Sequence, residues 1–256
     1  MSDVLPSSLI SLTSSLKRLG LGECELQGEF PTEMLNLLGQ LPSTLFNLTQ
    51  LIHLDLSFNS LEGPLPTQVS GLQNLEEFRM THNLLSGAIP SCLFTLPSLE
   101  YLGLSRNRTT GPINQIQKPN SVQRVFLANN DIHGSIFKWE SEGWQQLVTL
   151  NLSHNLQTSF EQFPGKNFRI LDLRSDLLQG PLLAPPPSLL EFFMSKDQLT
   201  GEIPPFIYNM TALETLDLSR NYLGGIIPAC LGNFSYILST INLQMNNFHG
   251  KIPPNF

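Results

Sequence analysis

The sequence predicts a repeat solenoid of the α/β class, with a parallel β-sheet on the concave face and short 3₁₀ or helical turns on the convex side. The first observation behind this prediction is the pattern L-x-x-L-x-x-L-x-L-x-x-N-x-L-x-G-x-(I/L)-P, which returns about every 24 residues from Leu48 onward. The second is composition: Gly and Pro recur at fixed positions of the pattern, while charged residues form only 14% of the chain. We therefore expect function on a repeated surface rather than in a pocket enclosed by one core.

The asparagine position of each unit sets the register of the array. It is occupied in turn by Cys24, Asn59, Asn83, Asn107, Asn130, Asn155, Asp176, Asp197, Asn221 and Asn246. The intervals after Asn59 are 24, 24, 23, 25, 21, 21, 24 and 25 residues. We predict a single array over residues 1–256, of about ten units, irregular at 31–42 and at 155–197. No capping unit is visible in the sequence, so we expect the array to be uncapped at both ends.

Each part of the pattern has a predicted structural role. The L-x-L alternation marks a short strand whose leucines point inward, and this strand pairs with its equivalent in the next unit. The asparagine amide that follows can both donate to and accept from backbone groups at the turn. Asp176 and Asp197 keep the acceptors but lose the donor, so we expect the stack to be weakest near them. The recurring glycine permits a tight bend, and the apolar segment after it should form the 3₁₀ or helical turn.

Charge and motif content exclude several functional classes. A net charge of −7 and a pI near 5.2 argue against a nucleic-acid partner. No apolar run reaches the 18 or so residues of a membrane helix. We predict no enzyme activity, cofactor or metal site, because the histidines are scattered and the sequence has no phosphate loop or paired-cysteine motif. Cys92 and Cys230 lie six repeats apart in the register, too far for a disulfide, and Cys24 occupies an asparagine position, so we expect three buried thiols.

The side chains that flank the inward leucines are the candidate ligand-binding residues. Large apolar groups on an open sheet are typical binding anchors, and arginines there can make forked contacts with a carboxylate. The candidates are Phe58, Arg79, Tyr101, Arg106, Arg124, Phe126, Arg174, Phe193, Lys196 and Arg220. We expect the four aromatic rings in this set to be exposed. Two alternatives stay open: the charges are those of an ordinary solvated face, and the rings are exposed by a decayed repeat.

Three N-x-(S/T) sequons share one position in the pattern. They begin at Asn47, Asn209 and Asn233, which lie 12, 12 and 13 residues before the next asparagine position. This spacing places them on the outer side, where N-glycosylation requires them to be. The sequons at Asn107 and Asn151 fall within the turn ladder and on the concave strand, so we do not expect them to be used.

The L-x-G-x-(I/L)-P addition makes the repeat resemble the plant-type leucine-rich repeat. Segments such as LRSDLLQGPLLAPPPSLLEFFMSKDQLTGEIP and CLGNFSYILSTINLQMNNFHGKIPP resemble plant receptor-like proteins of the disease-resistance class. The resemblance covers nearly the whole chain and implies a plant-type leucine-rich-repeat superhelix. It also implies a fragment of the ectodomain of a cell-membrane glycoprotein. Such a protein would recognise a peptide, protein or glycan ligand in immune or developmental signalling, with a receptor kinase as co-receptor.

Two further interpretations remain open from the sequence. One is a soluble inhibitor of a cell-wall hydrolase, of the polygalacturonase-inhibitor type, which the number of units fits. The other is a truncated, non-functional relic, which the half period at 31–42 favours.

Overall fold

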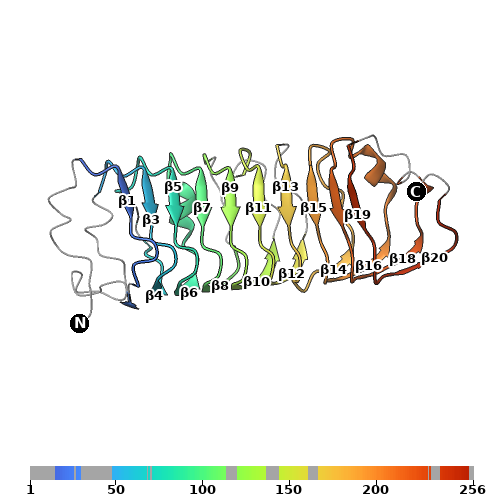
Figure 1. The fold of residues 1–256 in the computed structure, drawn as a ribbon, viewed down its shortest axis with the longest axis horizontal. Helices are drawn as coiled ribbons and strands as arrows, with labels where there is room; N and C mark the ends of the chain where they lie inside the picture. The colour runs from blue at the N-terminus through green and yellow to red at the C-terminus, as the bar shows by residue number, and fades with distance from the viewer. Residues whose placement is uncertain are drawn as a thin grey trace.

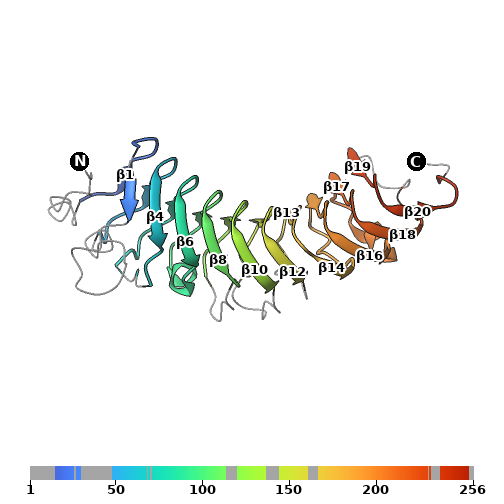
Figure 2. The ribbon, with the colours of Figure 1, turned by 90° about the horizontal axis from the view of Figure 1, so that it is seen from below.

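The computed structural model describes residues 15–25, 27–29, 48–67, 69, 71–113, 120–136, 144–160, 167–229, 231 and 237–253. These residues form an elongated, curved solenoid with β1 (Arg18–Gly20) and β20 (Asn247–His249) at opposite ends of its long axis (Figure 1, Figure 2). The predicted repeat solenoid is confirmed. The irregular stretch predicted at 31–42 lies outside the described residues.

A ten-stranded parallel sheet lines the concave side of the described solenoid. Its order is β1-β3-β5-β7-β9-β11-β13-β15-β17-β19, so each strand pairs with its counterpart one unit away. The central residue of a strand faces the core, as Leu54, Phe78 and Leu102 do with no exposed surface, because successive side chains alternate between the two faces. The strands after β1 are β3 (His53–Asp55), β5 (Glu77–Arg79), β7 (Tyr101–Gly103), β9 (Arg124–Phe126), β11 (Thr149–Asn151), β13 (Ile170–Asp172), β15 (Glu191–Phe193), β17 (Thr215–Asp217) and β19 (Thr240–Asn242).

A second, lateral layer of parallel strands follows the asparagine positions. The sequence predicts only a tight bend at the recurring glycine of this segment, and no strand. Six strands pair in the order β12-β10-β8-β6-β4-β2, and four more pair in the order β14-β16-β18-β20. The recurring glycines do bend the chain, since Gly63 and Gly134 have φ of 85° and 99°, but they do so within strands. These are β2 (Gln27–Glu29), β4 (Ser60–Pro64), β6 (Leu84–Ala88), β8 (Arg108–Gly111), β10 (Asp131–Ile136), β12 (Leu156–Phe160), β14 (Gln179–Pro181), β16 (Gln198–Glu202) and β18 (Tyr222–Ile226).

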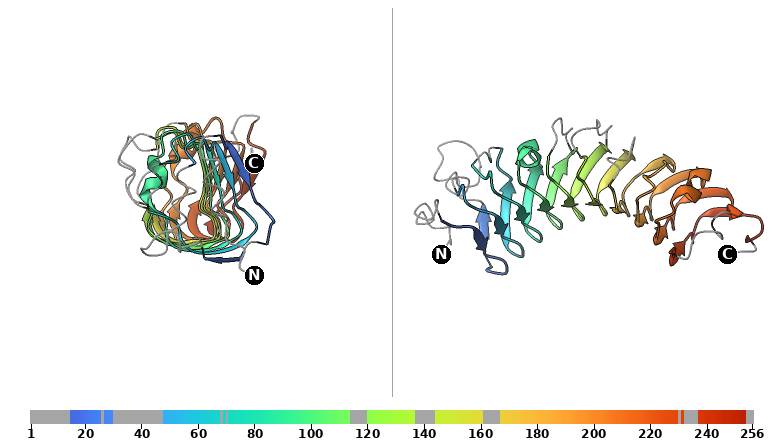
Figure 3. Two further views of the ribbon diagram at one scale, coloured as in Figure 1. Left: turned by 90° about the vertical axis from the view of Figure 1, so that its left-hand side faces the viewer. Right: turned by 90° about the horizontal axis from the view of Figure 1, so that it is seen from above.

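Short 3₁₀ helices lie on the convex side, as predicted. They are η2 (Ser91–Thr95) and η3 (Pro205–Asn209), each of which begins after a proline, and Figure 3 shows η2 on the outer side of the arc. Between them and the concave sheet runs a continuous column of leucines, such as Leu48, Leu51 and Leu56, that have no exposed surface. Burying each of these side chains contributes roughly 1.5–3 kcal/mol.

The asparagines form a hydrogen-bonded ladder that joins neighbouring units. The Nδ2 group of Asn83 donates to the Leu56 carbonyl of the preceding unit at 2.9 Å and to the Met80 carbonyl of its own unit at 3.2 Å. Its Oδ1 accepts from the Leu61 backbone N–H at 3.0 Å. One side chain therefore satisfies buried groups of two units, which is the role that the sequence predicted for it.

Cys24 occupies the ladder position of the first described unit but is exposed, so the prediction of a buried thiol is wrong there. The thiol of Cys92 is half-buried, and Cys230 lies outside the described residues. The backbone confirms the register at Cys24, because Glu23 before it has the left-handed φ of 57° that Phe58 also has, at 56°, before Asn59.

Candidate ligand-binding face

Two rows of side chains make up the outward surface of the concave side. The first comprises the first and third residues of each concave strand, which point away from the leucine core. The second, here called the rim, consists of the left-handed residue before each ladder position. The rim residues are Glu23, Phe58, His82, Arg106, Asn129, His154, Ser175, Lys196, Arg220 and Met245.

The densest arrangement on this face, here called the Tyr101 cluster, comprises Arg79, Tyr101, Arg124 and Phe126. The Cζ atoms of Arg79 and Arg124 lie 4.0 and 5.5 Å from the centroid of the Tyr101 ring. The Phe126 ring lies 5.2 Å from it, at a tilt of 31°. These residues come from the neighbouring strands β5, β7 and β9. The cluster therefore offers an aromatic surface with a guanidinium on either side, an arrangement stabilised by cation–π attraction.

Gly103 explains why the tyrosine lies over its own strand. A Cβ atom at Gly103 would lie 2.9 Å from Cε1 of Tyr101, closer than real Cβ contacts come. The ring therefore occupies the space that a third-position side chain takes in the other strands. As a result Tyr101 is half-buried, and so are Phe126 and Phe193. Only Phe58, at 50% exposure, fits the prediction that all four rings are exposed.

Acidic and imidazole groups hold Arg79 in place. Its Nε and Nη2 atoms each lie 3.1 Å from Oε2 of Glu77, and Nδ1 of His53 lies 3.5 Å from the same oxygen. Burial raises the pKa of Glu77, but the hydrogen bond and charge of Arg79, together with His53, outweigh burial and lower it. Glu77 is therefore ionised at neutral pH. The Arg79 guanidinium is fixed in orientation while its face remains against Tyr101.

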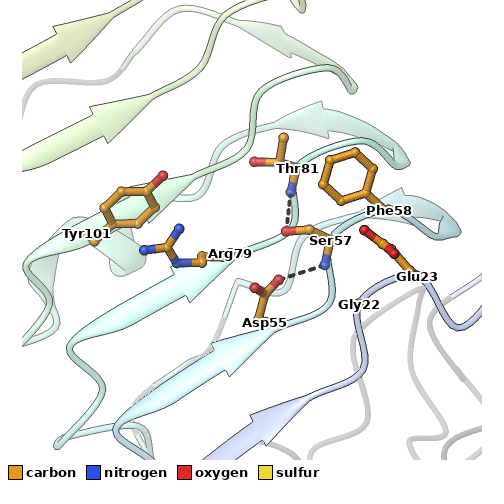
Figure 4. Close-up of a pocket in the computed structure, with 8 residues that line it drawn as sticks. All are labelled: Gly22, Glu23, Asp55, Ser57, Phe58, Arg79, Thr81 and Tyr101. Atoms are coloured by element: carbon orange, nitrogen blue, oxygen red, sulfur yellow. Dashed lines mark hydrogen bonds between the residues drawn. The ribbon is translucent and has the colours of Figure 1, made fainter.

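A hollow of about 390 Å³ extends from this cluster toward the N-terminal end (Figure 4). Its floor is rigid, because the Ser57 backbone N–H donates to Asp55 at 3.0 Å and Thr81 N–H donates to the Ser57 hydroxyl at 3.2 Å. The lining residues are Gly22, Glu23, Asp55, Ser57, Phe58, Arg79, Thr81 and Tyr101. Figure 4 shows Glu23 at one end of the hollow and the Arg79–Tyr101 pair at the other, with Asp55 beside Arg79, its register partner on the neighbouring strand.

Phe58 closes the rim side of the hollow by stacking on His82. The two ring centroids are 4.2 Å apart with an interplanar angle of 16°. Burial, with a smaller effect from the Arg106 charge, lowers the pKa of His82, so the stacked imidazole is neutral at neutral pH. Sequence analysis missed this partnership, although Phe58 and His82 occupy the same position of adjacent units, which is the signal that could have revealed it.

A second group of predicted residues lies beyond β11. Nη2 of Arg174 lies 2.7 Å from Oδ2 of Asp172, and its Cζ lies 4.6 Å from the centroid of Phe193. The Asp172 hydrogen bond, opposed by burial, raises the pKa of Arg174. The structure therefore brings six of the ten predicted residues into two groups, the Tyr101 cluster and an Arg174–Phe193 pair. The acidic partners Glu77 and Asp172 were not among the predicted site residues.

Four predicted cations have no acidic partner on the described surface. Arg106, Lys196 and Arg220 on the rim and Arg124 on β9 are exposed, and none forms a salt bridge with a described residue. They remain available to an anionic group of a ligand.

No group of three or more His, Cys, Asp or Glu side chains that could hold a metal ion occurs among the described residues. In the same part of the chain, no helix has the length and apolar character needed to cross a membrane. Asn209, at the end of η3, is exposed on the convex side, whereas Asn47 and Asn233 lie outside the described residues.

Comparison with known proteins agrees with this architecture. The family profile described as Leucine Rich Repeat matches residues 50–72 and 212–234. Receptor-like protein 6 of Arabidopsis thaliana is 33% identical over 141 residues, which are 54% of this chain and 14% of that protein. The structure titled PEPR1-AtPEP1 aligns with 93% of this chain and 36% of its own, at a TM-score of 0.81 and 28% identity. A plant peptide hormone receptor, RGFR1 in complex with RGF2, aligns with 99% of this chain and 47% of its own, at a TM-score of 0.76 and 26% identity.

The parallel concave sheet, its asparagine ladder and the repeat matches define a leucine-rich-repeat solenoid of the plant type. Within that class, the predicted resemblance to plant leucine-rich-repeat receptor-like proteins is confirmed by the relatives that carry this name. The aligned region spans about one seventh of Receptor-like protein 6.

Proposed function

We propose that this chain is a non-enzymatic recognition module that binds a ligand along its concave face. The observation that carries the proposal is the Tyr101 cluster, in which guanidinium groups from β5 and β9 flank an aromatic surface from β7. Aromatic and arginine side chains are the residue types that most often dominate binding energy at interfaces. Here they lie on an open sheet beside a hollow with a hydrogen-bonded floor, rather than inside an enclosed pocket.

The chemistry of the cluster favours a peptide that carries a carboxylate. Arg124 is exposed and has no acidic partner among the described residues, so two of its N–H groups can donate to one carboxylate. Tyr101 and Phe126 can pack against an apolar side chain next to that carboxylate. The structural similarity to a plant peptide hormone receptor in complex with RGF2 supports a peptide ligand.

The biological setting follows from the named relatives and is part of the same proposal. We place the array on the extracellular side of a plant cell membrane, in defence or developmental signalling with a partner receptor kinase. The exposed Asn209 sequon on the convex side would carry a glycan without obstructing the concave face. Asn47 and Asn233 are proposed as further glycan sites from their position in the repeat.

A binding experiment with paired peptides tests this function. The 256-residue chain is screened against a library of linear peptides, each made with a free C-terminal carboxylate and as the C-terminal amide. We expect peptides that bind as free acids, with affinity reduced roughly tenfold or more by Arg124→Ala and also by Tyr101→Ala. Arg108→Ala is the matched control, because Arg108 is exposed on the lateral strand β8. Binding that Tyr101→Ala leaves intact, or that Arg108→Ala weakens equally, would contradict the proposed site.

A further inference from the structure

The ladder changes its chemistry at two consecutive units. In the units on either side, each asparagine amide donates to carbonyl groups, as Asn155 does to Leu152 at 2.6 Å and Asn221 does to Leu218 at 3.1 Å. Asp176 and Asp197 occupy the same position but carry a second oxygen in place of the amide. They are 4% and 6% exposed, so water does not replace the missing donor.

Each aspartate uses one oxygen and leaves the other without a partner. Oδ1 of Asp176 accepts from the Asn155 and Gln157 backbone N–H groups at 3.0 and 3.4 Å. Oδ1 of Asp197 accepts from Asp176 and Leu178 in the same way. Among the described residues, six buried side-chain polar atoms have no hydrogen-bond partner, and four belong to this stretch: Gln157 Nε2, Ser175 Oγ, Asp176 Oδ2 and Asp197 Oδ2. Such a concentration requires a physical explanation.

The Leu173 carbonyl shows what is missing. Its equivalent in an asparagine region, the Leu104 carbonyl, accepts from the amides of Asn107 at 2.9 Å and Asn130 at 3.0 Å. The Leu173 carbonyl has Asp176 in its own unit and Asp197 in the next, and neither side chain has an amide. Two ionised carboxylates at these positions would place negative oxygens beside carbonyl oxygens in a region without water, which is strongly unfavourable. A protonated carboxyl, in contrast, has an O–H donor like the amide N–H.

Among the described residues, no cation forms a salt bridge with either aspartate. The charged or titratable residues on the concave strands and the rim of these units and their neighbours include Asp172, Arg174, Lys196, Asp217 and His154. Arg174 is paired with Asp172 at 2.7 Å, and the Asp172 charge acts against ionisation of both ladder aspartates. Burial first, and then the Asp197 charge, raise the pKa of Asp176 to about 8. Burial raises the pKa of Asp197 to about 7.

We propose that Asp176 and Asp197 are held protonated in the folded array, each with one Oδ2–H group that donates to a carbonyl of the kind that asparagine amides cap elsewhere, as at Leu173, and that their ionisation loosens the stack between β11 and β17. The two residues thus form a joint between units, which is hydrogen-bonded in acidic surroundings and weakened in alkaline ones. This inference does not depend on the proposed function, because it concerns the spine of the array and not its ligand.

The sign of the pH effect follows from proton counting. The ordinary carboxyl pKa of 3.8 applies to the unfolded chain, whereas both folded values are higher. Between these limits the folded state holds protons that the unfolded state has lost, so the free energy of unfolding falls as pH rises. The decrease should extend from about pH 4 to about pH 8 and then stop.

Thermal unfolding of the full 256-residue chain, in buffer with EDTA, tests the joint. We expect the wild-type melting temperature to be lower at about pH 8.5 than at about pH 5, by on the order of 5–10 °C. Asp176→Asn/Asp197→Asn restores both amides and should remove most of this difference. The exposed Asp131→Asn, on β10, is the matched control and should retain it. An equal pH difference in the double variant would overturn the proposal.

Infrared spectroscopy gives a second readout that does not depend on unfolding. At about pH 6, exposed carboxyl groups are ionised, so a protonated-carboxyl C=O band should be present in the wild type and absent from the double variant. Absence of the band in the folded wild type would also overturn the proposal.

Two further results would assign the ladder aspartates another partner. If Ca²⁺ added at about pH 8.5 raises the wild-type melting temperature but not that of the double variant, the pair is a cation site and not a proton site. If Gln157→Leu enlarges the pH difference, the Gln157 amide already serves an ionised Asp176. We expect neither effect.

Discussion

The units from β3 to β11 and the units at β13 and β15 share a concave sheet but differ in what joins them on the lateral side. In the first region the ladder residues are asparagines spaced 23 to 25 residues apart, and the lateral strands pair continuously from β2 to β12. In the second the ladder residues are aspartates spaced 21 apart, and β12 and β14 belong to different sheets. A backbone hydrogen bond from Leu177 to Gln157, at 2.9 Å, crosses the interruption.

The comparison shows which part of a unit tolerates shortening. Leu150, Leu171 and Phe192 remain fully buried across the interruption, so the three-residue concave strands keep their pairing. The lateral strand depends instead on the number of residues between the ladder position and the next concave strand. Shortening that segment leaves the concave sheet intact and removes the pairing of lateral strands between neighbouring units.

The largest effect should come from giving an asparagine unit the chemistry of the second region. Asn83→Asp at about pH 8 removes the donors to Leu56 and Met80 and buries a charge, which we expect to lower the free energy of unfolding by roughly 3–5 kcal/mol. The loss should shrink at about pH 5, and urea unfolding at both pH values measures it. Asn129→Asp, at the exposed rim, is the control. An Asn83→Asp loss that is the same at both pH values would mean that protonation does not replace the amide.

Hydrogen exchange should show the difference without substitution. At about pH 8, amide protection factors in residues 170–181 should be roughly tenfold lower than in residues 101–111, because local opening needs less free energy where ties are missing. The difference in protection factors between the two segments should become smaller at about pH 5. Equal protection in the two regions at both pH values would show that the interrupted lateral sheet does not weaken the array.

A pair of glycine substitutions sharpens the comparison of the lateral sheets. Gly87 and Gly180 both have a left-handed φ, 75° and 89°, so alanine is strained by about 1–2 kcal/mol at either position. An added Cβ at Gly87 would lie 3.4 Å from Cβ of Pro64 in the neighbouring unit, whereas nothing lies within 4 Å at Gly180. We expect Gly87→Ala to lower the melting temperature more than Gly180→Ala does. The reverse order would indicate closer lateral packing at β14 than the structure shows.

The smallest expected effects concern the two arginine–carboxylate pairs of the concave face. Arg174→Ala removes the guanidinium partner of Asp172, whose side chain is 6% exposed, and leaves only the backbone N–H of residue 174 as a donor, so we expect a loss of about 1 kcal/mol. Arg79→Ala leaves Glu77, which is 29% exposed, and water can replace the arginine, so the loss should be below about 0.5 kcal/mol. Chemical unfolding at neutral pH measures both. Equal losses would show that burial of the carboxylate does not set the difference.

The register of leucines and asparagines was sufficient to predict the solenoid, its concave sheet and the ladder. The lateral sheet was not predicted, because its strands find their partners only in neighbouring units, and the glycine within each was interpreted as a bend. A single unit contains nothing that distinguishes a bend from a strand with one left-handed residue.

The sequence predicted which residues belong to the candidate site but not how their side chains are arranged. The register located Arg79, Tyr101, Arg124 and Phe126 on the concave face, where the structure has them, and their role in binding stays a prediction. The sequence could not show that Tyr101 is half-buried, because its orientation depends on the missing side chain of Gly103 two residues later. The Phe58–His82 stack likewise depends on contact between units.

The spacing of the concave strands also determines which residues of an extended peptide ligand could contact successive units. Successive strands are about 4.8 Å apart, whereas an extended peptide advances about 3.4 Å per residue, so three units match four peptide residues. Phe126 on β9 and Phe193 on β15 occupy the same strand position three units apart. A peptide lying along the long axis would therefore meet these two rings with residues i and i+4, which project from the same side of the peptide strand.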